Sequence, residues 1–335
     1  MLILSSCERG RLKIFFLFSV LAAVFFSGVR YDAGNDYFTY YGMVKGEYWF
    51  DNIEISPRLI LSLAKSYQSP MIFFLITSAI YISSVAYFCW KQSKKPEISF
   101  FLFLLLPLSL LTSFGYVRQY VAIGLFLVSL SAFIDKKYFI SFLFIIFSVS
   151  FHTSAIVFAF AFVFHRLLSY RVYPIWLYVL IMTFSYPLSL LIVNYAYLAG
   201  NYQEYITGTN VIDSGKKIGL ICVSLFFYFW LFRRKLSSSV DVYFFNLYYV
   251  FSLIYLVLMD FGEYVSRISY YLMPCAYILF VSTLSSQRNT RLFQLSSVII
   301  FGLVMFYATL YFASINPSRD FLTNYSVILF NAPPK

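Results

Sequence analysis

Long apolar runs recur along the whole chain and limit its possible folds more than any other feature. A helix that crosses the hydrocarbon core of a bilayer needs about 20 apolar residues, and roughly 17–25 are tolerated. Hydrophobic residues make up 61% of the chain and charged ones 12%, which is too apolar for a soluble core. The sequence therefore predicts an all-α polytopic membrane protein with spans near 12–29, 69–90, 98–114, 119–134, 174–198, 218–232, 242–259, 268–284 and 292–313.

Basic residues gather in six short clusters between these runs. With their flanks, the clusters hold 15 Lys and Arg against four acids, and the rest of the chain holds ten of each, so the clusters carry the whole net charge of +11. Cytoplasmic loops are enriched in Lys and Arg, which predicts a cytoplasmic amino terminus and an outer carboxyl terminus. No basic run exceeds three residues, so nucleic acid is not an expected partner. The clusters are Arg9/Arg11/Lys13, Lys91/Lys94/Lys95, Lys136/Lys137, Arg166/Arg171, Arg233/Arg234/Lys235 and Arg288/Arg291.

The apolar stretch 138–165 lies between two clusters on the same predicted side, so it has to leave that side and return. At about 1.5 Å per residue it is too short for two full crossings. We expect a pair of short helices that meet within the membrane at the polar break 150–154, where irregular backbone must be shielded. The alternative is one long helix across the membrane, which would place Arg166 and Arg171 outside and reverse the predicted orientation of every later segment.

The short helix pair raises the count to about eleven membrane segments in a single domain, 1–335. The larger loops, 30–68 and 199–217, then lie outside, and residues 59–65 suit a short helix at the membrane interface. We therefore expect the function at the outer face.

Ionisable groups within membrane segments are costly, so the few that occur here are candidate functional residues. Arg118 stands at the outer start of the run 119–134, beside Gln119, where a guanidinium can hold a phosphate or diphosphate. The alternative is an arginine that only reaches the lipid headgroups. His152 lies in the break of the short helix pair, where it either exchanges a proton near neutral pH or packs in the interior.

Further charged residues lie in the predicted outer loops. Asp260, Glu263 and Arg267 are spaced to share one face of a helical turn, as a functional cluster or as a solvated ion pair. In the first outer loop, carboxylates such as Asp36 alternate with aromatic rings such as Tyr40. This pattern suits sugar binding and also an aromatic belt. Nucleotide-binding loops and zinc-ligand spacings are absent from the sequence, so no cofactor and no metal is expected.

Three segments, in this order, resemble the EpsG family of bacterial exopolysaccharide proteins, which includes Wzy-type O-antigen polymerases. The first is the Gly-Asn-Asp-Tyr-x-x-Tyr loop at 34–40. The second joins Val-Arg-Gln-Tyr at 117–120 to Phe-His-Thr-Ser-Ala at 151–155. The third is Ser-Arg-Ile-Ser-Tyr-Tyr at 266–271. The resemblance covers residues 30–275.

The resemblance implies an inverting glycosyl transfer at the outer face of the bacterial inner membrane, without nucleotide sugar or metal. A growing glycan would move from undecaprenyl diphosphate onto the non-reducing end of another lipid-linked oligosaccharide. Arg118, His152 and Arg267 occupy the matching positions, with Asp36 and Tyr40 in support. A co-polymerase that sets chain length is the implied protein partner, beside membrane lipids.

The chemistry of such a transfer assigns roles to these residues. Arg118 and Arg267 would stabilise the leaving diphosphate. His152 would accept the proton of the acceptor hydroxyl, with Glu263 or Asp36 as alternatives.

Two other functions fit a chain of this class. An O-antigen ligase shares the donor, but usually has a larger late outer loop than 199–217. A flippase without chemistry would carry charges in both halves of the bundle around a central cavity, whereas the candidate charges here concentrate at the outer end.

Overall fold

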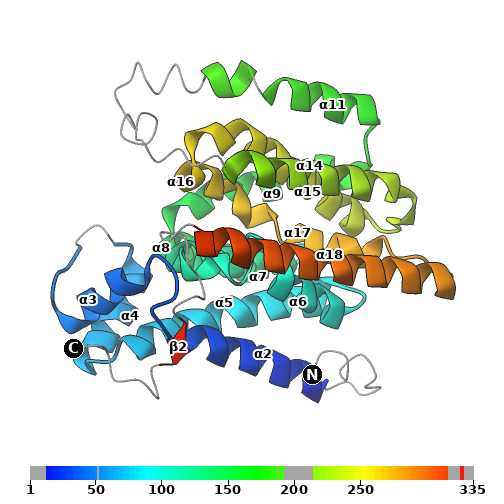
Figure 1. The fold of residues 1–335 in the computed structure, drawn as a ribbon. Coiled ribbons are helices and arrows are strands. Elements are labelled where there is room, and N and C mark those ends of the chain that lie inside the picture. The colour runs from blue at the N-terminus through cyan, green and yellow to red at the C-terminus, as the bar shows by residue number, and fades with distance from the viewer. Residues whose placement is uncertain (1–12, 51–52, 186, 192–213, 316–324, 328–335) are drawn as a thin grey trace. The chain divides into compact units, whose positions relative to one another are not determined.

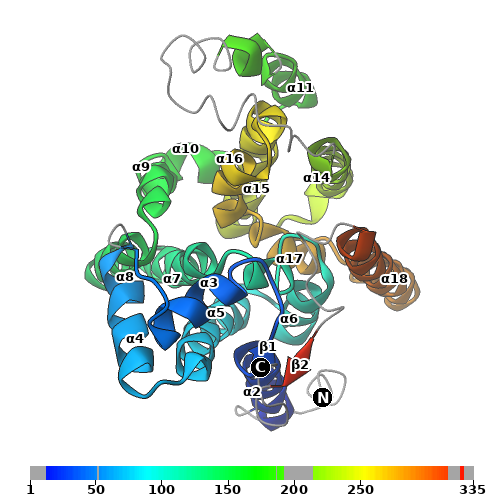
Figure 2. The same ribbon diagram turned by 60° about the vertical axis from the view of Figure 1, so that its left-hand side comes forward.

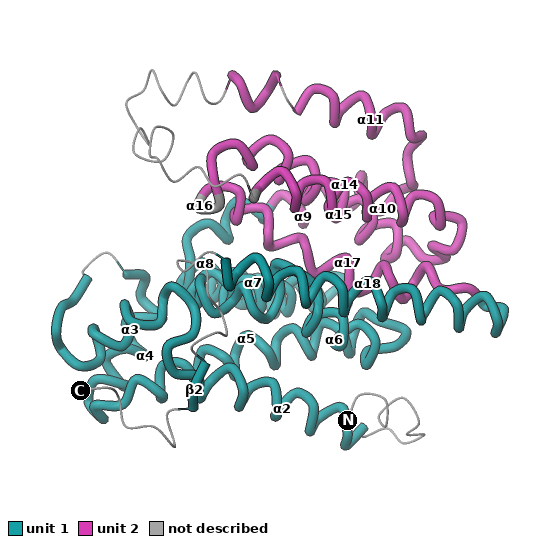
Figure 3. The backbone as a smooth tube through the Cα atoms, viewed as in Figure 1, with its two compact units in different colours: residues 1–159, 286–335 teal, residues 160–285 magenta. Residues whose placement is uncertain are grey.

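The structure, a computed structural model, describes residues 13–50, 53–185, 187–191, 214–315 and 325–327. These residues are mostly helical, which agrees with the all-α prediction apart from one short two-stranded sheet. They form two compact units, unit 1 with residues 1–159 and 286–335 and unit 2 with residues 160–285 (Figure 3). The single membrane domain predicted over 1–335 stays a prediction.

Unit 1 contains helices and one two-stranded sheet (Figure 1). β1 pairs antiparallel with β2, so that Arg30 lies opposite Val327 and Tyr31 opposite Ser326. A segment near the carboxyl terminus therefore lies beside the start of the first predicted outer loop. The elements are α2 (Ile14–Gly28), β1 (Arg30–Tyr31), α3 (Tyr37–Lys45), α4 (Ile55–Ser66), α5 (Pro70–Gln92), α6 (Pro96–Leu105), η1 (Thr112–Phe114), α7 (Val117–Ile134), α8 (Tyr138–Phe151), η2 (Thr153–Ala159), α18 (Arg288–Ile315) and β2 (Ser326–Val327).

Unit 2 is built around α15, which packs against α10, α14, α17 and η5. The start of α15 is set by a capping box, in which the Ser238 hydroxyl accepts the Asp241 amide at 3.0 Å and the Asp241 carboxylate accepts the Ser238 amide at 3.2 Å. The elements are α9 (Phe160–Val163), α10 (His165–Tyr170), α11 (Ile175–Thr183), α14 (Ser214–Leu231), η3 (Arg233–Lys235), α15 (Ser239–Leu258), η4 (Met259–Phe261), α16 (Glu263–Ser266), η5 (Arg267–Leu272) and α17 (Cys275–Ser282).

Four described helices are long and apolar enough to cross a membrane: Pro70–Gln92, Val117–Ile134, Ser239–Phe261 and Arg288–Ile315. Shorter apolar helices accompany them, so the chain has the character of a polytopic membrane protein, and the count of about eleven segments stays a prediction. In unit 1, 83% of an apolar 18-residue stretch of α7 is buried, whereas only 17% of the corresponding stretch of α18 is buried. The helix α7 is therefore central to its unit, whereas α18 exposes an apolar surface that suits lipid.

Ion pairs gather three basic clusters at one end of unit 1. Lys13 pairs with Glu97 at the start of α6, and Lys91 pairs with Asp135 at 3.8 Å, beside Lys136. The alternation of the spans across a membrane stays a prediction. Which side of the membrane this end faces stays a prediction.

Two predicted spans are not single α-helices, in both cases because of a proline. In the run 98–114, α6 ends at Leu105, and Leu106 is extended with ψ 148° because Pro107 disfavours a helical residue before it. In the run 268–284, Pro274 separates η5 from α17, because it has no amide hydrogen to continue a helical hydrogen-bond ladder.

The predicted loops are partly described. In the loop 30–68 the structure places α3 and α4, and α4 covers the short helix expected at 59–65. Most of the loop 199–217 lies outside the described residues. In the stretch 138–165, α8 ends at Phe151 and His152 is extended, with φ −158° and ψ 119°. The depth of this break in a membrane stays a prediction.

Candidate active site at the start of α7

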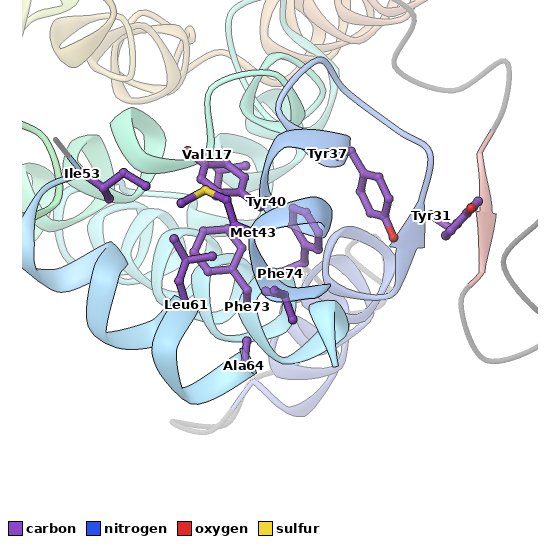
Figure 4. Close-up of a cluster of buried hydrophobic side chains, with 11 residues drawn as sticks. Tyr31, Tyr37, Tyr40, Met43, Ile53, Leu61, Ala64, Phe73, Phe74 and Val117 are labelled. Carbon is purple, nitrogen blue, oxygen red and sulfur yellow. The ribbon is translucent and has the colours of Figure 1, made fainter. Parts of the chain in front are cut away.

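The first loop of unit 1 folds onto the helix ends around α7. α4 packs against α5 and α8, and α3 packs against α4 and α5 (Figure 2). The Tyr40 ring lies 4.5 Å from that of Phe73, and the Tyr37 ring stacks on Phe74 at 4.7 Å. The shared core, shown in Figure 4, consists of Tyr31, Tyr37, Tyr40, Met43, Val44, Ile53, Leu61, Ala64, Phe73, Phe74 and Val117.

Arg30 anchors the beginning of this loop from inside the unit. Its side chain is 1% exposed, and its guanidinium lies between the rings of Phe74 and Phe114, at 4.6 and 4.5 Å. It donates to the carbonyls of Ala33, at 3.2 Å, and Ser27, at 2.5 Å. Burial lowers the pKa of Arg30 to about 10. Hydrogen bonds and ring faces thus offset part of the cost of burying a cation, and they hold the turn in place.

The turn presses against the segment that precedes α7. Gly34 has φ +91°, and a Cβ atom there would lie 2.3 Å from the carbonyl oxygen of Phe114, so the position requires glycine. Two residues later, Asp36 Oδ2 accepts the amide of Val117, the first residue of α7, at 3.1 Å. The carboxylate that was predicted to bind sugar therefore caps α7, where the positive end of the helix dipole favours a negative charge.

We expect Gly34→Ala to destabilise the fold more than Gly46→Ala. Gly46 also has a left-handed φ of +81°, but a Cβ there would meet nothing closer than 3.8 Å. Conformational strain costs about 1–2 kcal/mol at either position, and only at Gly34 must the backbone of a neighbour also move. Size-exclusion profiles of the solubilised protein after stepwise heating would measure both losses. Equal losses would contradict the close approach to Phe114.

Arg118, in the first turn of α7, is held by two side chains of the loop. Its Nε donates to the hydroxyl of Tyr40 at 3.0 Å, and its Nη1 forms an ion pair with Glu54 Oε2. The Arg118 side chain is 31% exposed and that of Glu54 is 15% exposed. Burial raises the pKa of Tyr40, and the nearby Asp36 carboxylate raises it further, so the Tyr40 hydroxyl stays neutral. The guanidinium is thus fixed in direction and still partly accessible to solvent.

The pairing of α7 with α8 places His152 at the level of Arg118. The Ser148 hydroxyl donates to the Ala122 carbonyl at 2.7 Å, and Ser141 and Ser129 share a hydrogen bond of 3.0 Å. Ser148 lies four residues before His152 and Ala122 four after Arg118. Likewise, Ser141 lies eleven residues before His152, and Ser129 lies eleven residues after Arg118. Since both contacts define one antiparallel register, His152 and Arg118 lie at the same height along the helix pair.

The contacts of His152 favour one of the two neutral forms of its ring. Its Nδ1 accepts the Ser154 amide at 3.3 Å and lies 2.8 Å from the Ser154 hydroxyl. An Nδ1 that accepts an N–H carries a lone pair, so the neutral ring has its proton on Nε2 and donates from there. This favours a hydrogen-bond donor over the predicted proton acceptor.

The start of α4 contacts both Arg118 and the end of α8 that precedes His152. Glu54, just before α4, contacts Arg118, and Ser56 in its first turn shares a 2.7 Å hydrogen bond with Ser150, two residues before His152. Gln119, in contrast, is 2% exposed and points into the interior of unit 1. The structure therefore does not bring Gln119 to the accessible side of Arg118.

The third predicted segment lies in unit 2. Arg267 begins η5, where the Ser269 hydroxyl donates to the Ser266 carbonyl at 2.8 Å. The helical face predicted for Asp260, Glu263 and Arg267 is interrupted, because Gly262 has φ 81° and ψ 175°, outside the helical region. Glu263 begins α16, and its side chain lies outside the described residues. The joint action of Arg267 with Arg118 stays a prediction.

Two residues of the site were missed by the sequence reasoning. Arg30 opens the first loop and Glu54 lies in its second half, but no spacing connects either to Arg118. The ion pair of Glu54 with Arg118 joins residues 64 positions apart, which only the fold brings together. In the part of the chain that the structure describes, no group of three or more His, Cys, Asp or Glu residues is placed to hold a metal ion.

Comparison with known proteins gives one finding. The model of the EpsG family matches residues 13–327, which is nearly the whole chain and includes both units. No curated protein and no solved structure matches the chain.

Proposed function

Because the chain belongs to the EpsG family, which is associated with Wzy-type polymerases, we propose that it polymerises a surface polysaccharide at the outer face of the bacterial inner membrane. Its donor is a glycan on undecaprenyl diphosphate, and its acceptor is the non-reducing end of another lipid-linked repeat unit. The anomeric carbon is inverted, and neither metal nor nucleotide takes part.

The common level of Arg118 and His152 is the observation that supports this proposal most. The leaving diphosphate gains negative charge as the glycosidic C–O bond breaks, and fixed donors aimed at that charge lower the barrier. Arg118, oriented by Tyr40, offers a planar cation that matches phosphate oxygens. His152, with its proton on Nε2, donates a second hydrogen bond to the same anion.

This assignment changes the role expected of His152. As proton acceptor, His152 would need the tautomer with Nδ1 protonated, which gives up the hydrogen bond from the Ser154 amide. We therefore assign to His152 the role of a hydrogen-bond donor that stabilises the leaving diphosphate. Arg267 remains the proposed second cation, and a co-polymerase the proposed partner for chain length.

Deletion of the gene tests the proposed function. We expect a gel of surface polysaccharide to lose its ladder and to retain a single repeat unit on its acceptor, with the ladder restored by the wild-type gene. If no unit reaches the acceptor at all, the ligase or flippase alternative replaces polymerisation. An unchanged ladder would contradict all three.

A further inference from the structure

Glu54 occupies the position on Arg118 that an anionic substrate requires. The Glu54 carboxylate forms an ion pair with Nη1, and both side chains are partly withdrawn from water. An arginine in such a place needs a counter-charge when no ligand is bound, because an unpaired buried charge is costly. Glu54 supplies that charge in the unliganded protein.

In the described part of the chain, the Glu54 side chain contacts Arg118 and does not cap α4. It occupies the N-cap position of α4 but makes no capping hydrogen bond to that helix. The adjoining turn is held separately, by the hydrogen bond between Ser56 and Ser150 and by the Arg58 guanidinium, which donates to the Ile53 carbonyl at 2.8 Å. The carboxylate can therefore leave Arg118 while the backbone of α4 stays in place.

A diphosphate is a stronger partner for Arg118 than a carboxylate is. It carries more negative charge and offers several oxygens to the guanidinium fork. Once both anions are close, their repulsion drives the carboxylate away. Arrival of the diphosphate thus frees Glu54 beside the reacting centre.

The transfer also requires a proton acceptor. Asp36 Oδ2 accepts the Val117 amide, and Nδ1 of His152 accepts the Ser154 amide, so each already has a backbone partner that proton uptake at that atom would displace. Resting on the proposed function, we infer that the diphosphate displaces Glu54 from Arg118 and that Glu54 then accepts the proton of the acceptor hydroxyl. The acceptor oxygen bonds to the anomeric carbon, the bond from that carbon to the diphosphate oxygen breaks, and the electron pair leaves with the diphosphate.

Glu54→Gln separates the two parts of this inference. The probe for the first is farnesyl diphosphate binding to the full chain in lipid nanodiscs, corrected for empty nanodiscs. We expect binding to become roughly threefold to tenfold tighter, since a competitor that occupies Arg118 for about 70–90% of the time weakens apparent affinity by that factor. Polymer formation in cells should fall roughly 10²–10⁴-fold, as for loss of a general base. Glu54→Asp should restore part of it.

Two controls make each outcome decisive. Glu47→Gln removes the same charge from an exposed position of the same loop and should change neither binding nor polymer. Weaker binding by Glu54→Gln would overturn the displacement, and a normal ladder with this variant would overturn the role as proton acceptor. If Arg118→Ala binds the probe as the wild type does, the diphosphate site of the proposed function fails instead.

Discussion

Arg118→Ala is expected to abolish the polysaccharide ladder. The variant loses the only described cation in the first turn of α7, and removal of one donor that stabilises a developing anion costs about 10²–10³ in rate. Arg118→Lys keeps the charge but loses the planar fork and the bond from Nε to Tyr40, so we expect an intermediate ladder. Surface polysaccharide from a deletion strain complemented with each variant measures the effect.

Protein abundance has to be compared in the same strains. Without Arg118 the Glu54 carboxylate is left partly buried and unpaired, which costs about 1–3 kcal/mol. Arg166→Ala, in an exposed position of α10, removes an equal charge and should leave the ladder unchanged. A normal ladder with Arg118→Ala at normal abundance would remove Arg118 from the site.

His152→Ala is expected to reduce polymer formation by about 10²–10³, the range for loss of one such donor. His152→Gln distinguishes the two chemical roles of the ring. A glutamine amide can donate near the position of Nε2 but cannot take up a proton at neutral pH. We therefore expect His152→Gln to form clearly more polymer than His152→Ala, measured on the same gels.

The second histidine provides the matched control. His165 lies at the start of α10 in unit 2, and His165→Gln should leave the ladder intact. If His152→Gln and His152→Ala are equally inactive, proton transfer by His152 is the better assignment. The role of Glu54 as proton acceptor would then also be in doubt.

Helix positions were largely predictable, because lipid imposes a length and a polarity on each span. The runs 12–29, 69–90 and 119–134 agree within a few residues with α2, α5 and α7. The runs 98–114 and 268–284 are not single α-helices because each contains a proline, and the hydropathy of a run does not depend on a missing amide hydrogen. In the first of these runs the irregular backbone is buried within the protein at Leu108, Leu111 and Phe114.

The sequence by itself determined the class of the protein, its apolar helices and the candidate residues Arg118 and His152, because these follow from composition and from the cost of charge in lipid. Only the tertiary structure decided which side chains lie beside these candidates. The serine contacts between α7 and α8 set the common level of Arg118 and His152. The packing of α4 brings Glu54 to Arg118 across 64 residues of chain. Such contacts depend on how helices pack sideways, and the periodicity of a single helix carries no information about the side chains of its neighbours.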